Sequence, residues 1–168
     1  MANQVIDHLH GDDVRLQRRG CELLQEMGER SWLSTQACNL AESLYALNRD
    51  EEAAEWAELG LELGASDDVI TQMLARQVLA KLAARRREHA RAETLAGEAV
   101  ALAETIQHPV AQADARMDLA EVLGMAGQTD RATTELERAA ALYARKGATA
   151  PLARAQQRLS ELAGQWGD

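Results

Sequence analysis

The sequence predicts an all-α protein, a right-handed superhelical solenoid built from antiparallel helix hairpins. Three sets of small residues share the same two intervals, 12 and then 7 positions. The sets are Ala41, Ala53 and Gly60; Ala80, Ala92 and Ala99; and Ala120, Ala132 and Ala139. Their period is 80 − 41 = 39 and then 120 − 80 = 40 residues, and periods in this range are typical of helical-hairpin solenoids. A leucine precedes each set (Leu40, Leu79 and Leu119) and is expected to fill the space between layers.

Composition supports a helical chain of one domain, residues 1–168. Alanine and leucine are abundant, phenylalanine is absent and only two prolines occur, both at expected helix boundaries. The net charge of −9 disfavours binding to nucleic acid or to an anionic membrane surface. Cys21 and Cys38 lack metal-ligand or disulfide spacing, which predicts free thiols in a reducing cytoplasm. The sequence shows neither a signal peptide nor an apolar run of the length that spans a bilayer.

The N-terminal segment, residues 1–30, is predicted to be a partial repeat. We expect a short helix over 1–9 that ends at His10 and Gly11, then a helix over 12–27 that starts at two aspartates. The interval from Val14 to Cys21 repeats the spacing of 7 found in the second helices. The segment therefore corresponds to the second half of a hairpin, and we expect the chain to begin inside a longer solenoid.

Three complete hairpins follow, in repeats 31–65, 66–107 and 108–147. Their predicted helices cover 32–47 and 50–63, then 68–86 and 88–107, then 109–125 and 130–146. Gly64 is expected to end a helix in the left-handed conformation, Pro109 to lie in a first helical turn and Thr129 to act as a cap. The small residue of each first helix is expected to face the second helix of the same hairpin. The small residues of each second helix are expected to let the next repeat pack closely. Residues 148–168 are predicted to form a capping helix over 151–164, with Trp166 folded back over the end.

The spacing resembles that of the tetratricopeptide repeat. Three stretches carry the resemblance: AESLYALNRDEEA (41–53), ASDDVITQMLARQVLAKLAARRREHARAETLAGEAVALAE (65–104) and DLAEVLGMAGQTDRATTELERAAALYARKG (118–147). The period exceeds the usual one of about 34. The turn glycine of the family is present in the third hairpin as Gly127, whereas the first and second hairpins have Asn48 and Arg87 at that position. This long form is similar to C-terminal repeat regions of bacterial signalling ATPases, transcription regulators and cyclase–ATPase–repeat proteins. The resemblance implies a regulatory or sensing arm that contacts other proteins and carries no catalysis.

The first helices of a solenoid line its concave face, which is the expected binding surface. Steps of 3 and 4 along these helices select thirteen candidate groove residues: Thr35, Cys38, Glu42, Tyr45, Gln77, Lys81, Arg85, Asp114, Met117, Glu121, Arg154, Gln157 and Glu161. Their mixed charge suits an extended or helical peptide segment of a partner protein. Lys81 and Arg85 alone resemble the clamp with which some members of the repeat family hold a terminal carboxylate.

Other functions have weaker support in the sequence. It contains no phosphate-binding loop, nucleophile elbow or metal-binding doublet, so it predicts neither an enzyme nor a cofactor. His8, His10, Asp12 and Asp13 could be drawn as a metal cluster, although a solvated helix end is the simpler interpretation. Arg85, Arg86 and Arg87 suit the C-terminal end of a helix better than a nucleic-acid patch. A small-ligand sensor remains an alternative, and self-association through the exposed N-terminal edge is expected.

Overall fold

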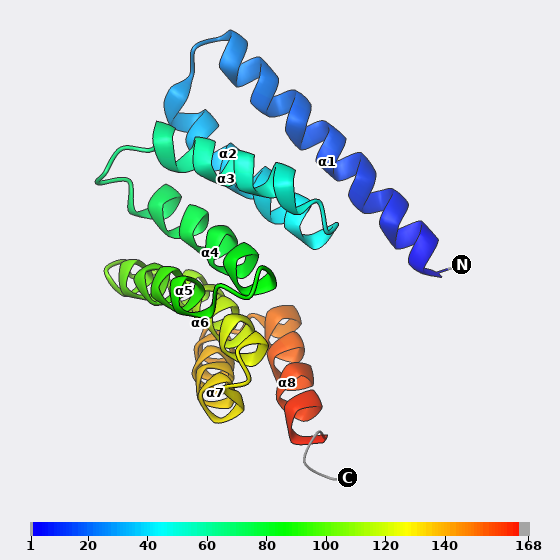
Figure 1. Ribbon diagram of the computed structural model, residues 1–168, viewed down its shortest axis with the longest axis vertical. Coiled ribbons are helices and arrows are strands. Elements are labelled where there is room, and N and C mark those ends of the chain that lie inside the picture. Colours follow the sequence, from blue (N-terminus) through cyan, green and yellow to red (C-terminus); the bar gives the residue numbers. More distant parts are fainter. Residues whose placement is uncertain (1, 165–168) are drawn as a thin grey trace.

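The protein is a solenoid of eight helices in the part of the chain that the computed structural model describes, the backbone of residues 2–164 with the side chains of residues 13–164. Figure 1 shows the helices following one another along the long axis, from α1 at one end to α8 at the other. They are α1 (Ala2–Glu26), α2 (Arg30–Ala46), α3 (Asp50–Leu63), α4 (Val69–Arg85), α5 (His89–Glu104), α6 (Pro109–Met125), α7 (Thr129–Lys146) and α8 (Thr149–Gly164). The all-α helical-repeat architecture predicted from the period is confirmed.

The helices pack as three hairpins, α2 with α3, α4 with α5 and α6 with α7. Each helix also packs on the next in sequence, so α1 covers α2 and α8 covers α7. The first helices touch one another, α2 on α4 and α4 on α6, whereas the described second helices α3, α5 and α7 have no comparable mutual packing. The first helices therefore form the inner layer of the curve and the second helices the outer one.

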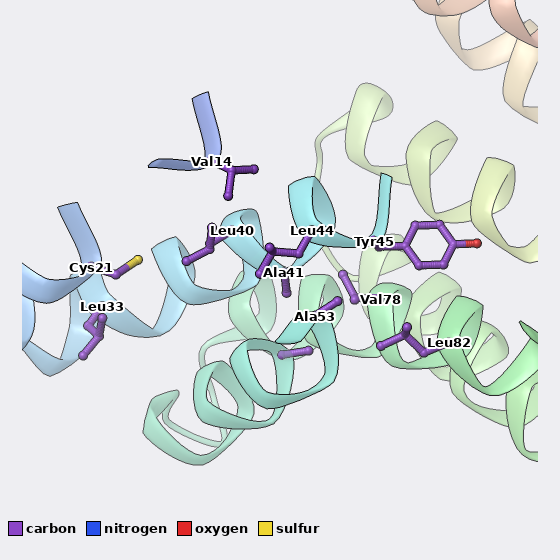
Figure 2. Close-up of a cluster of buried hydrophobic side chains, with 11 residues drawn as sticks. Val14, Cys21, Leu33, Leu40, Ala41, Leu44, Tyr45, Ala53, Val78 and Leu82 are labelled. Atoms are coloured by element: carbon purple, nitrogen blue, oxygen red, sulfur yellow. The ribbon is translucent and has the colours of Figure 1, made fainter. Parts of the chain in front are cut away.

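All nine recurring small residues are buried, which is why the helices approach closely. Figure 2 shows one resulting core cluster, in which Val14 and Cys21 of α1 meet α2 at Leu40 and Leu44. Val78 and Leu82 of α4 close the cluster from the next repeat and make the layers continuous. The expected interlayer leucines also pack on core clusters, with Leu40 fully buried and Leu79, Leu119 and Leu159 half-buried.

Two glycines have roles that differ from those predicted. Gly60 on α3 does not admit the next repeat: a Cβ there would lie 2.5 Å from Cys38 Sγ and 2.8 Å from the Ser34 carbonyl oxygen, both on its own mate α2. Gly64 is not left-handed, since its φ is −68° and its ψ is 132°. A Cβ at Gly64 would lie 2.7 Å from Cγ2 of Thr71 on α4, so this glycine is the one that admits the next repeat.

Several predicted helix ends are also wrong. Helix α1 continues through Gly11, because one internal glycine costs about 1 kcal/mol and does not by itself stop a helix. Thr129 is the first residue of α7, after an N-cap Gln128 without a capping side-chain bond. Pro109 does begin α6, where the His108 imidazole accepts a hydrogen bond from the Ala111 amide at 3.1 Å.

One turn geometry recurs within and between the hairpins. Within residues 2–164, positive φ values occur at five positions: Gly28, Asn48, Arg87, Gly127 and Gly147. At each, the next residue's amide donates a hydrogen bond to the carbonyl five positions earlier, as Arg49 does to Leu44 at 3.0 Å. The turns at Asn48, Arg87 and Gly127 lie inside hairpins, and their fixed geometry returns each second helix onto the first.

None of the helices in the described part of the chain combines the length and the apolar character needed to cross a membrane. The predicted position of Trp166 lies outside the described residues.

Candidate functional site

The inner layer encloses a cavity of about 780 Å³. Helices α2, α4 and α6 supply most of its lining, and α7 and α8 close it at the C-terminal end. The volume is in the range of about 300–1,000 Å³ found for ligand sites.

Ten of the thirteen candidate groove residues line this cavity. They are Cys38, Glu42, Tyr45, Gln77, Lys81, Arg85, Asp114, Met117, Glu121 and Arg154. The other three, Thr35, Gln157 and Glu161, do not line it. The structure thus brings most of the set together, and its use in binding stays a prediction.

Thr35 joins two repeats instead of facing the cavity. Its hydroxyl lies 2.9 Å from that of Thr71 on α4, and the Ser34 hydroxyl lies 3.4 Å from the same oxygen. On α8, Gln157 donates a hydrogen bond to Glu161 at 2.9 Å, and both side chains are exposed. The cavity instead meets α8 at Arg154 and Arg158, so the groove-facing side of this helix is turned away from Gln157.

Sequence reasoning missed five polar lining residues: Asn39, His108, Asp118, Tyr143 and Arg158. Asp118 is four residues after Asp114 and therefore on the same helical face, but the steps taken along α6 pass over it. Arg158 is 37 residues after Glu121, close to the repeat period, and pairs with it at 2.9 Å. Tyr143 comes from the second helix of its hairpin, which the inner-layer rule excludes.

Lys81 is at the centre of the charged half of the cavity, the surface formed by Lys81, Glu42, Asp118 and Glu121. The side chain is 2% exposed, and its ammonium nitrogen lies 2.6 and 2.7 Å from the two carboxylate oxygens of Glu42 on α2. It lies 3.2 Å from Oδ1 of Asp118 on α6. Burial opposes the charge, but the Asp118 and Glu42 carboxylates outweigh it and raise the pKa of Lys81. Its three donors are used, so Lys81 ties three repeats together and offers nothing further to a ligand.

Asp118 has an unusual protonation equilibrium for an aspartate. Burial raises the pKa of its carboxyl to about 7, against the pull of Lys81, and the nearby carboxylates of Glu42 and Glu121 add to the rise. The side chain keeps 20% of its surface exposed, toward the cavity that it lines. Lys81 cannot fully compensate because two carboxylates share it.

Tyr45 and Glu121 bridge the groove. The Tyr45 hydroxyl on α2 donates to Oε1 of Glu121 on α6 at 2.5 Å, 76 residues away, and Arg158 of α8 donates to the other oxygen at 2.9 Å. Burial raises the pKa of Tyr45, and its bond to Glu121 adds to the rise, so the hydroxyl stays protonated and donates. Burial also acts on Glu121, but Tyr45, Lys81 and Arg158 outweigh it and lower the pKa of that carboxyl. The Tyr45–Glu121 bond joins first helices that are not neighbours in the stack, since α4 lies between α2 and α6.

The basic run ends α4, as expected for cations at a helix C-terminus. Arg85 is engaged inside the protein: it pairs with Asp50 of α3, and its guanidinium carbon lies 3.6 Å from the centre of the Tyr45 ring. Arg86 and Arg87 are exposed. Because Arg85 is paired with Asp50, only Arg86 and Arg87 of the three arginines are exposed to bind a nucleic acid.

The half of the cavity that lies at the N-terminal ends of α4 and α6 contains an apolar surface. Ile70, Met73 and Leu74 of α4 line it together with Ala111 of α6. Ile70 is 40% exposed and Leu74 is half-buried, so apolar surface remains open to a partner. The cavity therefore has an apolar half beside a charged half along the same helices.

The cysteines are free and buried. Burial raises the pKa of the Cys38 thiol to about 12, and the charge of Asp68 adds to the rise. Cys38 is thus a neutral thiol at physiological pH and unsuited to act as a nucleophile. In the metal cluster drawn from the sequence, the side chains of His8, His10 and Asp12 lie outside the described residues, and Asp13 is exposed on α1.

Comparison of the chain with known protein families finds no matching family model, and comparison with curated proteins finds no match either.

Proposed function

We propose that this protein is a non-catalytic interaction module that binds a peptide segment of a partner protein in its concave groove. The single observation that carries this proposal is the cavity of about 780 Å³, to which the first helices of all three hairpins contribute. A stacked set of parallel helices offers repeated side-chain positions along an extended surface, as a peptide requires. The neutral Cys38 thiol supports the absence of nucleophilic chemistry there.

The spacing of small residues and the repeated hairpin turn support a tetratricopeptide-like repeat of the long variety. That resemblance favours a role as the regulatory or sensing arm of a larger bacterial signalling protein. The free cysteines suit a reducing cytoplasm, where we place the protein.

A peptide selection tests the proposal. Peptides from a random phage-displayed library are selected on the folded protein and measured against Ala46→Trp, a variant that fills the cavity from an exposed lining position. We expect micromolar binding that weakens at least tenfold in Ala46→Trp. Ala141→Trp, at an exposed site on α7 that does not line the cavity, is the matched control and should bind as the wild type does. A selection without enrichment, or unchanged binding by Ala46→Trp, contradicts the proposal.

A small-ligand sensor is the second candidate, and the size of the cavity favours it. The Tyr45–Glu121 bond crosses the groove and narrows it, which suits a compact ligand. A thermal-shift screen against a metabolite panel separates the two functions. Stabilisation by a small metabolite that Ala46→Trp abolishes supports the sensor, and its absence leaves the peptide module.

We also propose self-association through the N-terminal edge. Three apolar side chains, Leu16 and Leu23 of α1 and Met27 just after its end, are spaced by 7 and 4, with exposures of 66%, 43% and 72%. Trp32 at the start of α2 is 67% exposed. Light scattering should show mass rising with concentration, and Leu16→Glu combined with Met27→Glu should abolish the rise. A strict monomer at high concentration contradicts this.

A further inference from the structure

When Asp118 is ionised, the charged half of the cavity has one negative charge too many. Three carboxylates, Glu42, Asp118 and Glu121, then face two cations, Lys81 and Arg158, because Arg85 is paired with Asp50. The three donors of Lys81 are already used by Glu42 and Asp118. Carboxylate oxygens have lone pairs to spare, so this surface can accept further hydrogen bonds but has few to give.

Gln77 gives a second and independent indication of a missing donor. Its side chain is 4% exposed, lines the cavity and donates from Nε2 to Oδ2 of Asp118 at 3.0 Å. The other amide atom, Oε1, is buried without a hydrogen-bond partner among the described residues. Rotating the amide would place its oxygen against the Asp118 carboxylate, so the observed orientation is the better one and still leaves an acceptor unused.

We propose that Glu42, Gln77 and Asp118 form a seat for a lysine or arginine side chain of the bound peptide. This inference rests on the proposed function and names the chemistry of its partner. The cation supplies the missing charge beside Glu42 and ionised Asp118. It also supplies a donor for Gln77 Oε1 once the Gln77 side chain turns this buried atom toward the ligand. An apolar residue next to it in the peptide lies against Ile70 and Leu74, the open part of the apolar half.

The charge of the whole protein favours the same partner. A net charge of −9 attracts basic segments over long range and repels acidic ones. The exposure of Glu42, whose side chain is 52% accessible, leaves one wall of the seat open to solvent. The structure therefore favours a basic peptide over one that presents a terminal carboxylate.

Matched probe peptides test the seat. The probes are acetyl-Ala-Leu-Lys-Ala-amide and its Gln and Glu counterparts at the third position, titrated into the 15N-labelled protein and followed at the Gln77 side-chain amide. We expect the Lys peptide to bind at least tenfold more tightly than the Glu peptide and to shift the Gln77 signal. Glu42→Gln should weaken the Lys peptide at least fivefold. Glu55→Gln, at an exposed position on α3 outside the cavity, should leave it unchanged.

The protonation of Asp118 supplies a second readout. The groups that face its carboxyl are Lys81 and Gln77 of α4, Glu42 of α2, Glu121 of α6 and Tyr143 of α7. A proton and the ligand cation compete for the same carboxylate, so affinity for the Lys peptide should rise as pH increases from 6 to 8, by up to about tenfold. Asp118→Asn should remove that rise.

Each contrary result has its own meaning. If the Gln or Glu peptide binds in the groove as tightly as the Lys peptide, the cationic seat is wrong and groove binding stands. If phage-selected peptides bind but all three probes fail to shift Gln77, the seat is also wrong. Failure of the selected peptides as well removes the proposed function itself. A titration with spermidine completes the test. If spermidine shifts the Gln77 side-chain amide signal at a lower concentration than the Lys peptide does, the occupant is a free polyamine and the proposal of a peptide is wrong.

Discussion

Single side chains decide how closely the helices of this protein approach. The closest approach is at Gly60, where the backbone carbonyl of Ser34 and the sulfur of Cys38 occupy the space that a Cβ would need. Cys38 has little freedom to move because it is buried, with its sulfur 3.8 Å from the Thr71 carbonyl oxygen. Glycine at this position is therefore a packing requirement between α2 and α3, not a conformational one.

Gly60→Ala should lower the free energy of unfolding by about 1–3 kcal/mol, since overpacking against a backbone atom outweighs the gain in helix propensity. Gly97→Ala on α5 is the control: its added Cβ meets nothing within 4 Å, so it should stabilise by up to about 1 kcal/mol. Urea denaturation followed by circular dichroism measures both. Equal shifts of the two variants would show that the α2–α3 contact does not limit the packing.

The raised pKa of Asp118 should make the stability of the protein depend on pH. Its pKa is about 7 in the folded protein, raised by burial and by Glu42 and Glu121 against the pull of Lys81. The unfolded chain loses that proton near pH 4. The folded state therefore binds more protons between these values, and this group's contribution to stability is lost as pH rises through 7.

Asp118→Asn should abolish this contribution. Between pH 4.5 and 8, the free energy of unfolding of the wild type should fall by roughly 2–4 kcal/mol relative to Asp118→Asn, a figure set by about 1.4 kcal/mol per pKa unit. Urea titrations at several pH values provide the measurement. Parallel pH profiles for the two proteins would show that the carboxyl ionises normally.

At the scale of secondary structure, the turns do as much as the helices to establish the repeat. Asn48, Arg87 and Gly127 occupy equivalent positions in the three hairpins and have φ values of 57°, 61° and 73°. Glycine adopts this region without cost and asparagine tolerates it, but a long side chain pays about 1–2 kcal/mol. The hydrogen bonds around Arg87 hold it there, since Arg87 donates to Ala84 and Glu88 to Ala83, both at 2.9 Å.

Arg87→Gly should stabilise the protein by about 0.5–1 kcal/mol, because relief of the left-handed conformation exceeds the entropy that glycine adds to the unfolded chain. Arg86→Gly removes the same charge one residue earlier, where φ is −78°, and should destabilise instead. Thermal unfolding of the two variants at one pH makes the comparison. A loss of stability in both would mean that the Arg87 side chain makes a contribution larger than its backbone strain.

At the scale of the whole molecule, a few long-range contacts hold the curve of the solenoid. Repeat proteins are stabilised mainly between neighbours, and their curvature follows from small rotations added from repeat to repeat. Here the Tyr45–Glu121 bond skips a repeat and joins α2 to α6, while Arg158 extends the link to α8. The Tyr143–Asp114 bond, also 2.5 Å, lies within one hairpin. The two tyrosines thus make similar hydrogen bonds, one between separate repeats and one within a single hairpin.

Tyr45→Phe should open the solenoid and increase its radius of gyration in small-angle X-ray scattering. Tyr143→Phe should lose a comparable amount of stability, about 1–3 kcal/mol for a hydrogen bond to a carboxylate, without opening it. Circular dichroism would establish that both variants keep their helices. Superimposable scattering of Tyr45→Phe and wild type would show that packing alone sets the curvature.

Much of the candidate site followed from the inner-layer rule, and its errors on α8 have one cause. Nine of the ten lining residues that were predicted lie on α2, α4 and α6, which repeat at 39 to 40 residues and share one phase. The tenth is Arg154 of α8. On α8 the prediction chose Gln157 and Glu161, although Arg158 turns toward Glu121. Rotation of a terminal helix depends on packing against one neighbour only, and the interval of 37 residues from Glu121 to Arg158 departs from the period of 39 to 40 that the other first helices share.

The sequence by itself determined the helices, their order and the repeat, because the spacing of small residues and turn residues is a local property that each hairpin expresses alone. Only the tertiary structure decided which charges meet. Lys81 lies between Glu42 and Asp118 because the first helices of neighbouring repeats pack side by side. Tyr45 reaches Glu121 because the curve of the solenoid brings the first and third hairpins together. The excess charge and the unused acceptor of the proposed seat arise from these contacts between repeats and not from any single repeat.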